Sequence, residues 1–155
     1  MSDSSTKFVY VTYIAAAPEA IFEAITRPEI ARQYWGHENI SDWKPGSKWE
    51  HVRGGDAART VRIAGNIVEC DPPRRMVFSW AGASDYDDAT KHSRVTFNLE
   101  PFQGMVKLTV THDELAEGSE MARNISNGWP RVLSSMKSFL ETGTALDVFA
   151  QPKAS

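Results

Sequence analysis

The middle of the chain, from residue 49 to residue 112, alternates apolar and polar positions in short segments. Alternation of this kind predicts β-strands with one face on a core and the other in water. The polar positions include Glu50, Arg62, Arg94 and Lys107. Five strands are expected, and the positions on their dry face are Trp49 and His51; Val61, Ile63 and Ile67; Met76, Phe78 and Trp80; Val95, Phe97 and Leu99; and Val106, Leu108, Val110 and His112.

Turn-forming residues separate these segments at regular intervals. They fall at residues 45–46, 54–56, 71–73, 82–88 and 101–104, where Gly, Pro and Asp are concentrated. Such residues adopt the backbone angles of tight turns without strain. Short turns between alternating segments predict an antiparallel meander.

Two short helices are expected after a first strand. Residues 8–14 are rich in β-branched and aromatic residues and predict that strand. Pro18 and Pro28 each suit the first turn of a helix, where a missing N–H is tolerated. The second helix is expected to end near Tyr34-Trp35-Gly36.

A long helix is expected near the C-terminus. Ser119 is a good N-cap and Gly143 a good terminator, and Pro130 lies between them in what we expect to be a bent, continuous helix. Its apolar residues recur at steps of three or four and share one face: Met121, Ile125, Trp129, Val132, Met136 and Phe139, widened by Leu133 and Leu140. An apolar helix after many strands needs a sheet to cover it.

Composition limits the possible classes of protein. A chain of 155 residues suits one domain over residues 1–155, and a net charge of −3 gives no reason to expect nucleic acid as a partner. Its apolar runs fall short of the roughly 20 residues of a membrane span, and residues 1–7 are polar, without a signal-peptide core. A single cysteine, Cys70, suits a reducing compartment, so a cytoplasmic location is expected.

The order of elements and several local strings resemble a known family. The strings are APEAIF at residues 17–22, YW at 34–35, GNIVECDPPRR at 65–75, Trp80, SRVTF at 93–97, LTVTH at 108–112, and GWP through LETG at 128–143. They resemble the START-like (SRPBCC) superfamily, in the branch related to the C-terminal domain of the activator of the heat-shock-protein-90 ATPase. The match runs from about residue 8 to residue 143.

This resemblance implies an α+β helix-grip fold. In that fold a curved antiparallel sheet of about six or seven strands surrounds a long C-terminal helix, and two short helices follow the first strand. It also implies a cavity between sheet and helix that often receives a hydrophobic ligand, but not one particular reaction. The eukaryotic activator has a further N-terminal domain that engages the chaperone, and from a length of 155 residues we expect this chain to lack it.

Fourteen residues are candidates for the wall of such a cavity. Each Trp among them has two interpretations, as core or as cavity wall. His51 and His112 end apolar alternations, so each is either a hydrogen-bonded core residue or a polar or proton-transferring contact for a guest. The candidates are Trp35, Trp49, His51, Val61, Ile63, Phe78, Trp80, Phe97, Leu108, Val110, His112, Trp129, Leu133 and Met136.

Other chemistry has little support in the sequence. The four histidines are scattered, and one cysteine cannot build a structural zinc site, so neither metal nor cofactor is expected. Asp71 beside Cys70 would raise rather than lower the pKa of the thiol. His37 and His92 are expected to be solvated. Residues 35–43 and the acidic segment around Asp85, Asp87 and Asp88 are candidate flexible lids.

Three hypotheses follow for function. The first is binding of a small hydrophobic or aromatic ligand between the sheet and the long helix. The second is an enzyme of the cyclase, dehydratase or hydrolase kind that uses His51 or His112. The third is an interaction module that modulates a chaperone or another protein partner. A homodimer is compatible with all three.

Overall fold

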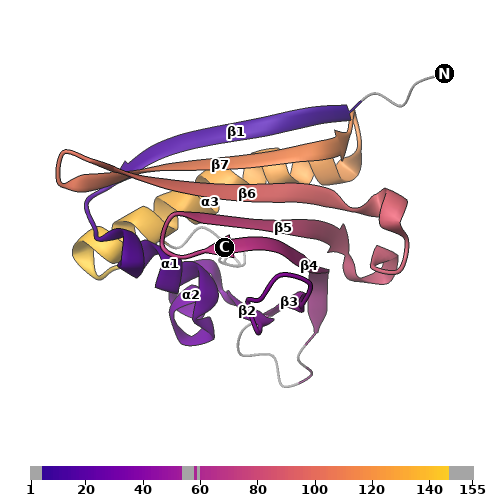
Figure 1. Ribbon diagram of the computed structural model, residues 1–155, viewed down its shortest axis with the longest axis horizontal. Helices are drawn as coiled ribbons and strands as arrows, with labels where there is room; N and C mark the ends of the chain where they lie inside the picture. Colours follow the sequence, from indigo (N-terminus) through magenta and orange to yellow (C-terminus); the bar gives the residue numbers. More distant parts are fainter. Residues whose placement is uncertain (1–4, 54–57, 59, 147–155) are drawn as a thin grey trace, which may run out of the picture.

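The computed structural model describes residues 5–53, 58 and 60–146 (Figure 1). The described residues form one seven-stranded antiparallel sheet in the order β1-β7-β6-β5-β4-β3-β2. The strands are β1 (Ser5–Ile14), β2 (His37–Ser41), β3 (Lys48–Arg53), β4 (Val61–Asp71), β5 (Arg75–Gly82), β6 (Ser93–Phe102) and β7 (Met105–Ala116). The turn expected at residues 54–56 and the tail at 151–155 lie outside the described residues.

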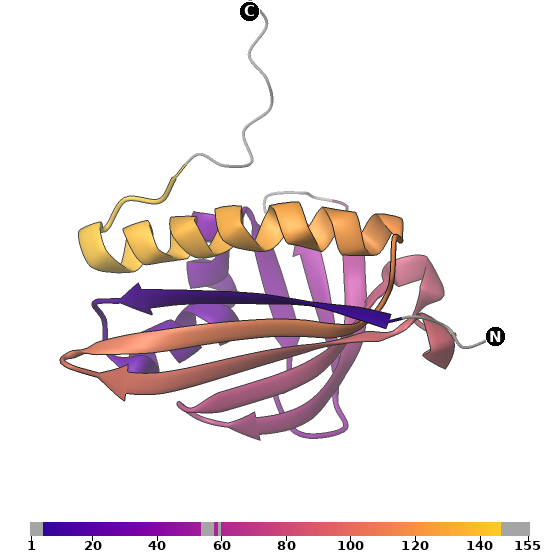
Figure 2. The same cartoon turned by 90° about the horizontal axis from the view of Figure 1, so that it is seen from above.

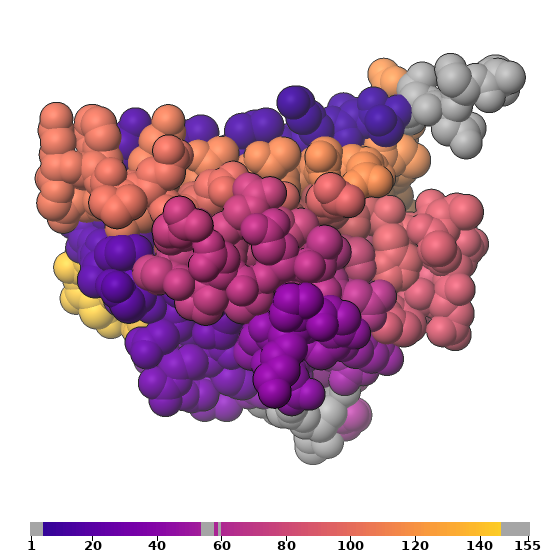
Figure 3. All heavy atoms as spheres, in the orientation of Figure 1, coloured from indigo at the N-terminus to yellow at the C-terminus, as the bar shows by residue number. Residues whose placement is uncertain are grey.

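Helix α3 (Glu120–Thr142) lies along the concave side of the curved sheet, as Figure 2 shows. It packs against β1, β7 and the short helix α2 (Pro28–Trp35). Figure 3 shows the outer face of the sheet, where β1, β7, β6 and β5 lie side by side. The arrangement confirms the expected α+β helix-grip fold.

The ends of α3 follow from its sequence. The Ser119 hydroxyl accepts a hydrogen bond from the backbone N–H of Ala122 at 3.1 Å, which satisfies one of the unpaired amides of the first turn. Gly143 ends the helix with a φ of 83°, a left-handed conformation that glycine adopts without strain. Pro130 lies inside the helix, which is continuous as expected.

The two short helices also begin where the prolines indicate. Helix α1 (Pro18–Thr26) and α2 each have proline in the first turn. The Tyr34 hydroxyl donates to the carbonyl of Ala24 at 2.8 Å and joins α2 to α1. The Ser135 hydroxyl donates to the carbonyl of Tyr34 at 2.8 Å and joins α3 to α2. These contacts hold the C-terminal end of α2, including Trp35, beside the long helix.

The prediction of a lid over residues 35–43 was wrong. Residues 37–41 form strand β2, which pairs with β3 so that Asn39 lies opposite His51. Glu38 and Asn39 are buried although both are polar, because Arg32 pairs with Glu38 at 2.7 Å and the Asn39 amide has partners within the fold. The segment lacks the apolar alternation of the other strands, so its sequence pattern resembles that of a loop.

The acidic segment around Asp85 is also more regular than a loop. It forms two short 3-10 turns, η1 (Ala83–Asp85) and η2 (Ala89–Lys91), between β5 and β6. The Tyr86 hydroxyl donates to the side-chain oxygen of Asn66 on β4 at 2.6 Å. The Tyr86 side chain therefore fixes the segment to the sheet, and the acidic composition of the segment does not indicate this contact.

Gly65 occupies a position on β4 where the fold admits no side chain. A Cβ at this residue would overlap the backbone carbonyl of Ser79 and would lie 2.6 Å from the indole nitrogen of Trp49. Those two groups are hydrogen bonded to each other, with the Trp49 indole N–H donating to the Ser79 carbonyl at 2.7 Å. The glycine thus allows a buried tryptophan on β3 to reach the backbone of β5.

We predict that Gly65→Ala lowers the free energy of unfolding by about 2–4 kcal/mol, because the new methyl group separates the Trp49 indole from Ser79. Gly128→Ala is the matched control: its Cβ meets nothing within 4 Å, and alanine in a helix is favoured over glycine by about 1 kcal/mol. Urea denaturation of both variants measures the difference. Equal stability of the two variants would contradict the assigned role of Gly65.

Candidate functional site

A cavity of about 230 Å³ lies between the N-terminal half of α3 and strands β3, β4 and β5. It is partly open to solvent. It forms where α3, which packs on β1, β7 and α2, is not in close contact with the other side of the sheet. Its lining residues carry no formal charge: Trp35, His51, Ile63, Trp80, Met121, Asn124, Ile125, Gly128, Trp129 and Val132.

The structure brings some of the candidate pocket residues together at this cavity and leaves the others elsewhere. Those that line it are Trp35, His51, Ile63, Trp80 and Trp129. Val61 is partly exposed on β4 and does not line it. The remaining candidates are buried but do not line the cavity: Trp49, Phe78, Phe97, Leu108, Val110, His112, Leu133 and Met136.

Half of the cavity wall was missing from the candidate list. Met121, Ile125 and Val132 belong to the apolar face predicted for the long helix, and that face was the available signal. Asn124 and Gly128 are also part of the wall, although neither is apolar enough to attract attention. Periodicity identifies the face of a helix that is buried, but not the place along the helix where packing is loose.

Three indole rings and one imidazole ring form the aromatic part of the wall. The ring centroid of Trp129 lies 5.6 Å from that of Trp35 and 5.4 Å from that of Trp80. His51 lies 4.6 Å from Trp35 and 6.1 Å from Trp80 by the same measure. These tilted contacts fix the rings against one another. The cavity therefore presents a preformed aromatic surface to a guest.

His112 is a fully hydrogen-bonded residue of the core. The Trp129 indole N–H, which can only donate, points to Nδ1 of His112 at 3.0 Å. Nε2 of His112 must then carry the proton, which it donates to the Ser93 hydroxyl at 2.7 Å. That hydroxyl donates to the backbone carbonyl of Trp80 at 3.1 Å. Since both ring nitrogens are engaged, His112 has no free atom for a guest.

His51 has the opposite tautomer. The side-chain amide of Asn39 donates to the carbonyl of Ile25 at 2.9 Å, which turns its oxygen toward Nδ1 of His51 at 2.7 Å. Nδ1 therefore carries the proton, and Nε2 keeps its lone pair. None of the described residues forms a hydrogen bond with Nε2. His51 thus brings a hydrogen-bond acceptor to the wall of the cavity.

Burial keeps both histidines neutral. Burial lowers the pKa of His112 from 6.5 to about 3. Burial also lowers the pKa of His51 well below 6.5, and the positive charges of His37 and Arg62 lower it further. Burial likewise lowers the pKa of His37. Neutral imidazole is therefore the form present at the cavity near neutral pH.

The expectation of solvated His37 and His92 was wrong. His37 lies on β2, half-buried and stacked on His51 with ring centroids 4.5 Å apart. Nδ1 of His92 bonds with the Ser79 hydroxyl at 2.9 Å, and its Nε2 bonds with the carbonyl of Tyr86 at 2.8 Å. His37 and His92 both lie close to turns in the sequence, and a position near a turn does not indicate that a side chain will find partners within the fold.

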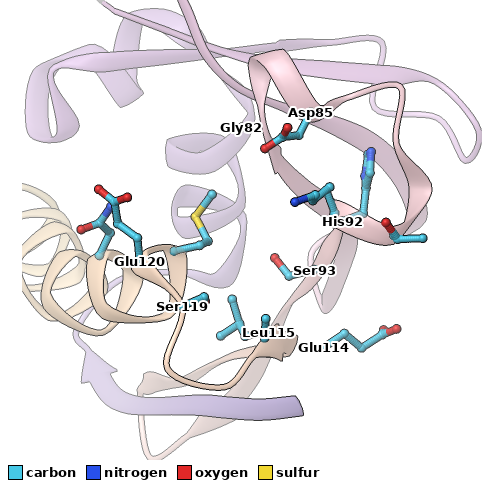
Figure 4. Close-up of a pocket in the computed structure, with 13 residues that line it drawn as sticks. Gly82, Asp85, His92, Ser93, Glu114, Leu115, Ser119 and Glu120 are labelled. Atoms are coloured by element: carbon cyan, nitrogen blue, oxygen red, sulfur yellow. The ribbon is translucent and has the colours of Figure 1, made fainter. Parts of the chain in front are cut away.

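A second, polar cleft of about 460 Å³ adjoins the start of α3. Figure 4 shows Glu120 on one side of it and Asp85 on the other, with Ser93 and Leu115 lower in the view. Met121 and Asn124 line both this cleft and the aromatic cavity. The first turns of α3 therefore separate a polar hollow from an apolar one.

Metal and thiol chemistry receive no new support. Within the described part of the chain, no three His, Cys, Asp or Glu side chains are grouped closely enough to hold a metal ion. Burial raises the pKa of the Cys70 thiol, and the charge of Asp71 raises it further, as expected. A raised pKa disfavours the reactive thiolate. None of the described helices is long and apolar enough to cross a lipid bilayer.

Comparison with solved structures identifies the same class of fold. The dimeric Aha1 protein from Colwellia psychrerythraea has a TM-score of 0.72 and 19% identity, with 89% of this chain and 98% of that chain covered. CalU16 from Micromonospora echinospora has a TM-score of 0.69 and 19% identity over 90% and 78% of the two chains. PFC0360w, an HSP90 activator from Plasmodium falciparum, has values of 0.70 and 22% over 86% and 95%. No curated protein matches the sequence.

The fold and its cavity define a member of the SRPBCC, or START-like, class. The family model described as activator of Hsp90 ATPase homolog 1-like protein matches residues 15–141 of the 155. The chain therefore belongs to that family, which confirms the resemblance seen in the sequence.

We predict that Trp129→Phe is more destabilising than Trp35→Phe by about 1–3 kcal/mol. Both changes remove similar ring area, but only the first leaves Nδ1 of His112 buried without a donor. Guanidinium denaturation of the two variants measures the difference. Similar losses in both would show that the bond between Trp129 and His112 contributes little.

We also predict that stability falls as the pH is lowered from 6.5 toward 4.5. In this range the unfolded chain protonates its histidines, whereas His51 and His112 stay neutral in the folded state because their pKa values are lowered. The free energy of unfolding should fall increasingly steeply, by at most about 1.4 kcal/mol per pH unit for each of them.

Carboxylates such as Glu29 and Glu141 have pKa values lowered from 4.5 in the folded state. Their protonation lowers the free energy of unfolding mainly below pH 4.5, at the acidic end of this range and beyond. Urea titrations at several pH values between 6.5 and 4.5 provide the measurement. A free energy of unfolding that is constant or rises toward pH 4.5 would contradict the assigned neutral histidines.

Proposed function

We propose that this protein binds a small, predominantly apolar ring compound in the cavity between α3 and strands β3 to β5. The observation that supports the proposal most strongly is the lining itself. Three indole rings and three aliphatic side chains, Ile63, Ile125 and Val132, surround a space with no charged residue on its wall. Ligand sites in proteins have this composition, mostly apolar with a few orienting polar groups.

The volume of the cavity favours a ligand of one or two rings. Its 230 Å³ exceeds the ~150 Å³ of an apolar cavity that takes up benzene, and lies below the ~300–1,000 Å³ of sites for drug-sized molecules. A long acyl chain or a polycyclic lipid needs more room. The proposal is therefore limited to small ligands.

Two alternatives have narrower support. Proton-transfer catalysis of the cyclase, dehydratase or hydrolase kind would depend on His51, because both ring nitrogens of His112 are engaged. Modulation of a chaperone is suggested by the family to which the chain belongs and by its similarity to the HSP90 activator from Plasmodium falciparum. The second alternative does not need the cavity, so blocking the cavity separates it from ligand binding.

We expect toluene, p-xylene and p-cresol to bind the folded protein and to shift its tryptophan fluorescence, because three of the five Trp residues line the cavity. Calorimetry measures the affinity. Gly128→Leu introduces a side chain at the cavity wall and should weaken binding at least tenfold. Asn127→Leu adds the same side chain at an exposed neighbouring position and should bind as the natural protein does.

The result that would overturn the proposal is an absence of both heat and fluorescence change with all three compounds. Equal affinity in Gly128→Leu and Asn127→Leu would also overturn it, since the compounds would then bind elsewhere. Mass spectrometry of small molecules that co-purify with the natural protein, compared with Gly128→Leu, would identify the physiological ligand.

A further inference from the structure

We infer that the ligand is an uncharged ring compound carrying a hydroxyl group, such as a phenol, and that the hydroxyl donates a hydrogen bond to Nε2 of His51. This inference rests on the proposed function and specifies the class of ligand. It depends on the one ring nitrogen of His51 that has no hydrogen-bond partner among the described residues, at a cavity whose lining is otherwise mostly apolar.

The first step is the fixed direction of the His51 ring. Asn39, on the neighbouring strand β2, is itself held by the carbonyl of Ile25, so its oxygen is turned to Nδ1 of His51. The imidazole is further held between the rings of Trp35 and His37, with centroids at 4.6 and 4.5 Å. The ring cannot exchange its nitrogens without breaking the Asn39 contact. Nε2 is consequently an acceptor of fixed position.

The second step is the unusual state of that acceptor. His51 is only 5% exposed, and it lines the cavity. Nε2 is not among the fully buried polar atoms without a partner, so this nitrogen is accessible from the partly open cavity. Within the described part of the chain, Nε2 has no hydrogen-bond partner, while Nδ1 is bonded to Asn39. A guest that donates a hydrogen bond would supply the missing partner.

The Trp80 ring lines the same wall. Its indole N–H is fully buried and forms no hydrogen bond with the described residues, so it offers no surface to a guest. Its ring centroid lies 6.1 Å from that of His51. A hydroxyl group can donate a hydrogen bond, so it matches the free acceptor Nε2 of His51. A carbonyl or ether oxygen, which only accepts, leaves Nε2 unpaired.

The third step concerns charge. Three indole rings could also surround an organic cation, since aromatic cages bind quaternary ammonium groups. A positive group lies near His51, however, because the charge of Arg62 acts on its ring. No carboxylate lines the cavity to balance a cation. The surroundings therefore favour an uncharged guest.

The test compares p-cresol with p-xylene, two compounds of similar shape that differ by hydroxyl against methyl. We expect His51→Phe to weaken p-cresol relative to p-xylene by about five- to tenfold compared with the natural protein. His37→Phe is the matched control: it changes the ring stacked on His51 but lies outside the cavity wall, and it should leave the ratio unchanged.

A ratio that does not change in His51→Phe would overturn the inference while ligand binding itself stands. Failure of both compounds to bind the natural protein would instead overturn the proposed function. Benzylammonium should bind at least tenfold more weakly than benzyl alcohol, and equal or tighter binding would overturn the assignment of an uncharged ligand.

A second measurement needs no variant, because His51→Phe leaves the Asn39 oxygen buried without its donor and could unfold. In ¹⁵N spectra of the natural protein, the Nε2 resonance of His51 should move when p-cresol is added and stay in place with p-xylene. Binding of p-cresol with no movement of that resonance would show that the hydroxyl does not reach His51.

Discussion

The buried chain of hydrogen bonds that runs from Trp129 through His112 and Ser93 to the carbonyl of Trp80 joins the long helix to the sheet. It connects α3 with β7, β6 and β5 through buried side chains, and an unpaired polar atom is costly in a buried position. Each member therefore fixes the next. The chain holds the indole ring of Trp129 and the backbone of Trp80, two residues of the cavity wall, so the shape of the cavity depends on it.

The contrast between His51 and His112 shows how one residue type serves two purposes within one fold. Both are neutral and buried, and both end a predicted apolar alternation. The donor-only indole of Trp129 directs one tautomer, and the oriented amide of Asn39 directs the other. His112 consequently completes the interior, whereas His51 leaves one nitrogen available. The difference lies in their neighbours from other strands and helices rather than in their own positions along the chain.

This contrast also marks the extent to which the sequence predicts the structure. Periodicity, prolines and caps predicted both short helices, the long helix with Pro130 inside it, and most of the sheet, because those signals are local. Strand β2 was missed because its buried residues, Glu38 and Asn39, are polar and are satisfied by partners distant in the sequence. The cavity wall was predicted only in part. The pattern correctly predicts that Trp49 and Leu133 are buried, but it does not indicate that they lie away from the cavity.

Met121 and Asn124 belong both to the aromatic cavity and to the polar cleft shown in Figure 4. Both lie in the first turns of α3, and terminal turns are the parts of a helix that open most readily. The Ser119 cap opposes that opening. If a guest binds as proposed and passes these turns, its rates of entry and release depend on the Ser119 hydroxyl, and its residence time can then change in evolution without alteration of any residue that touches it.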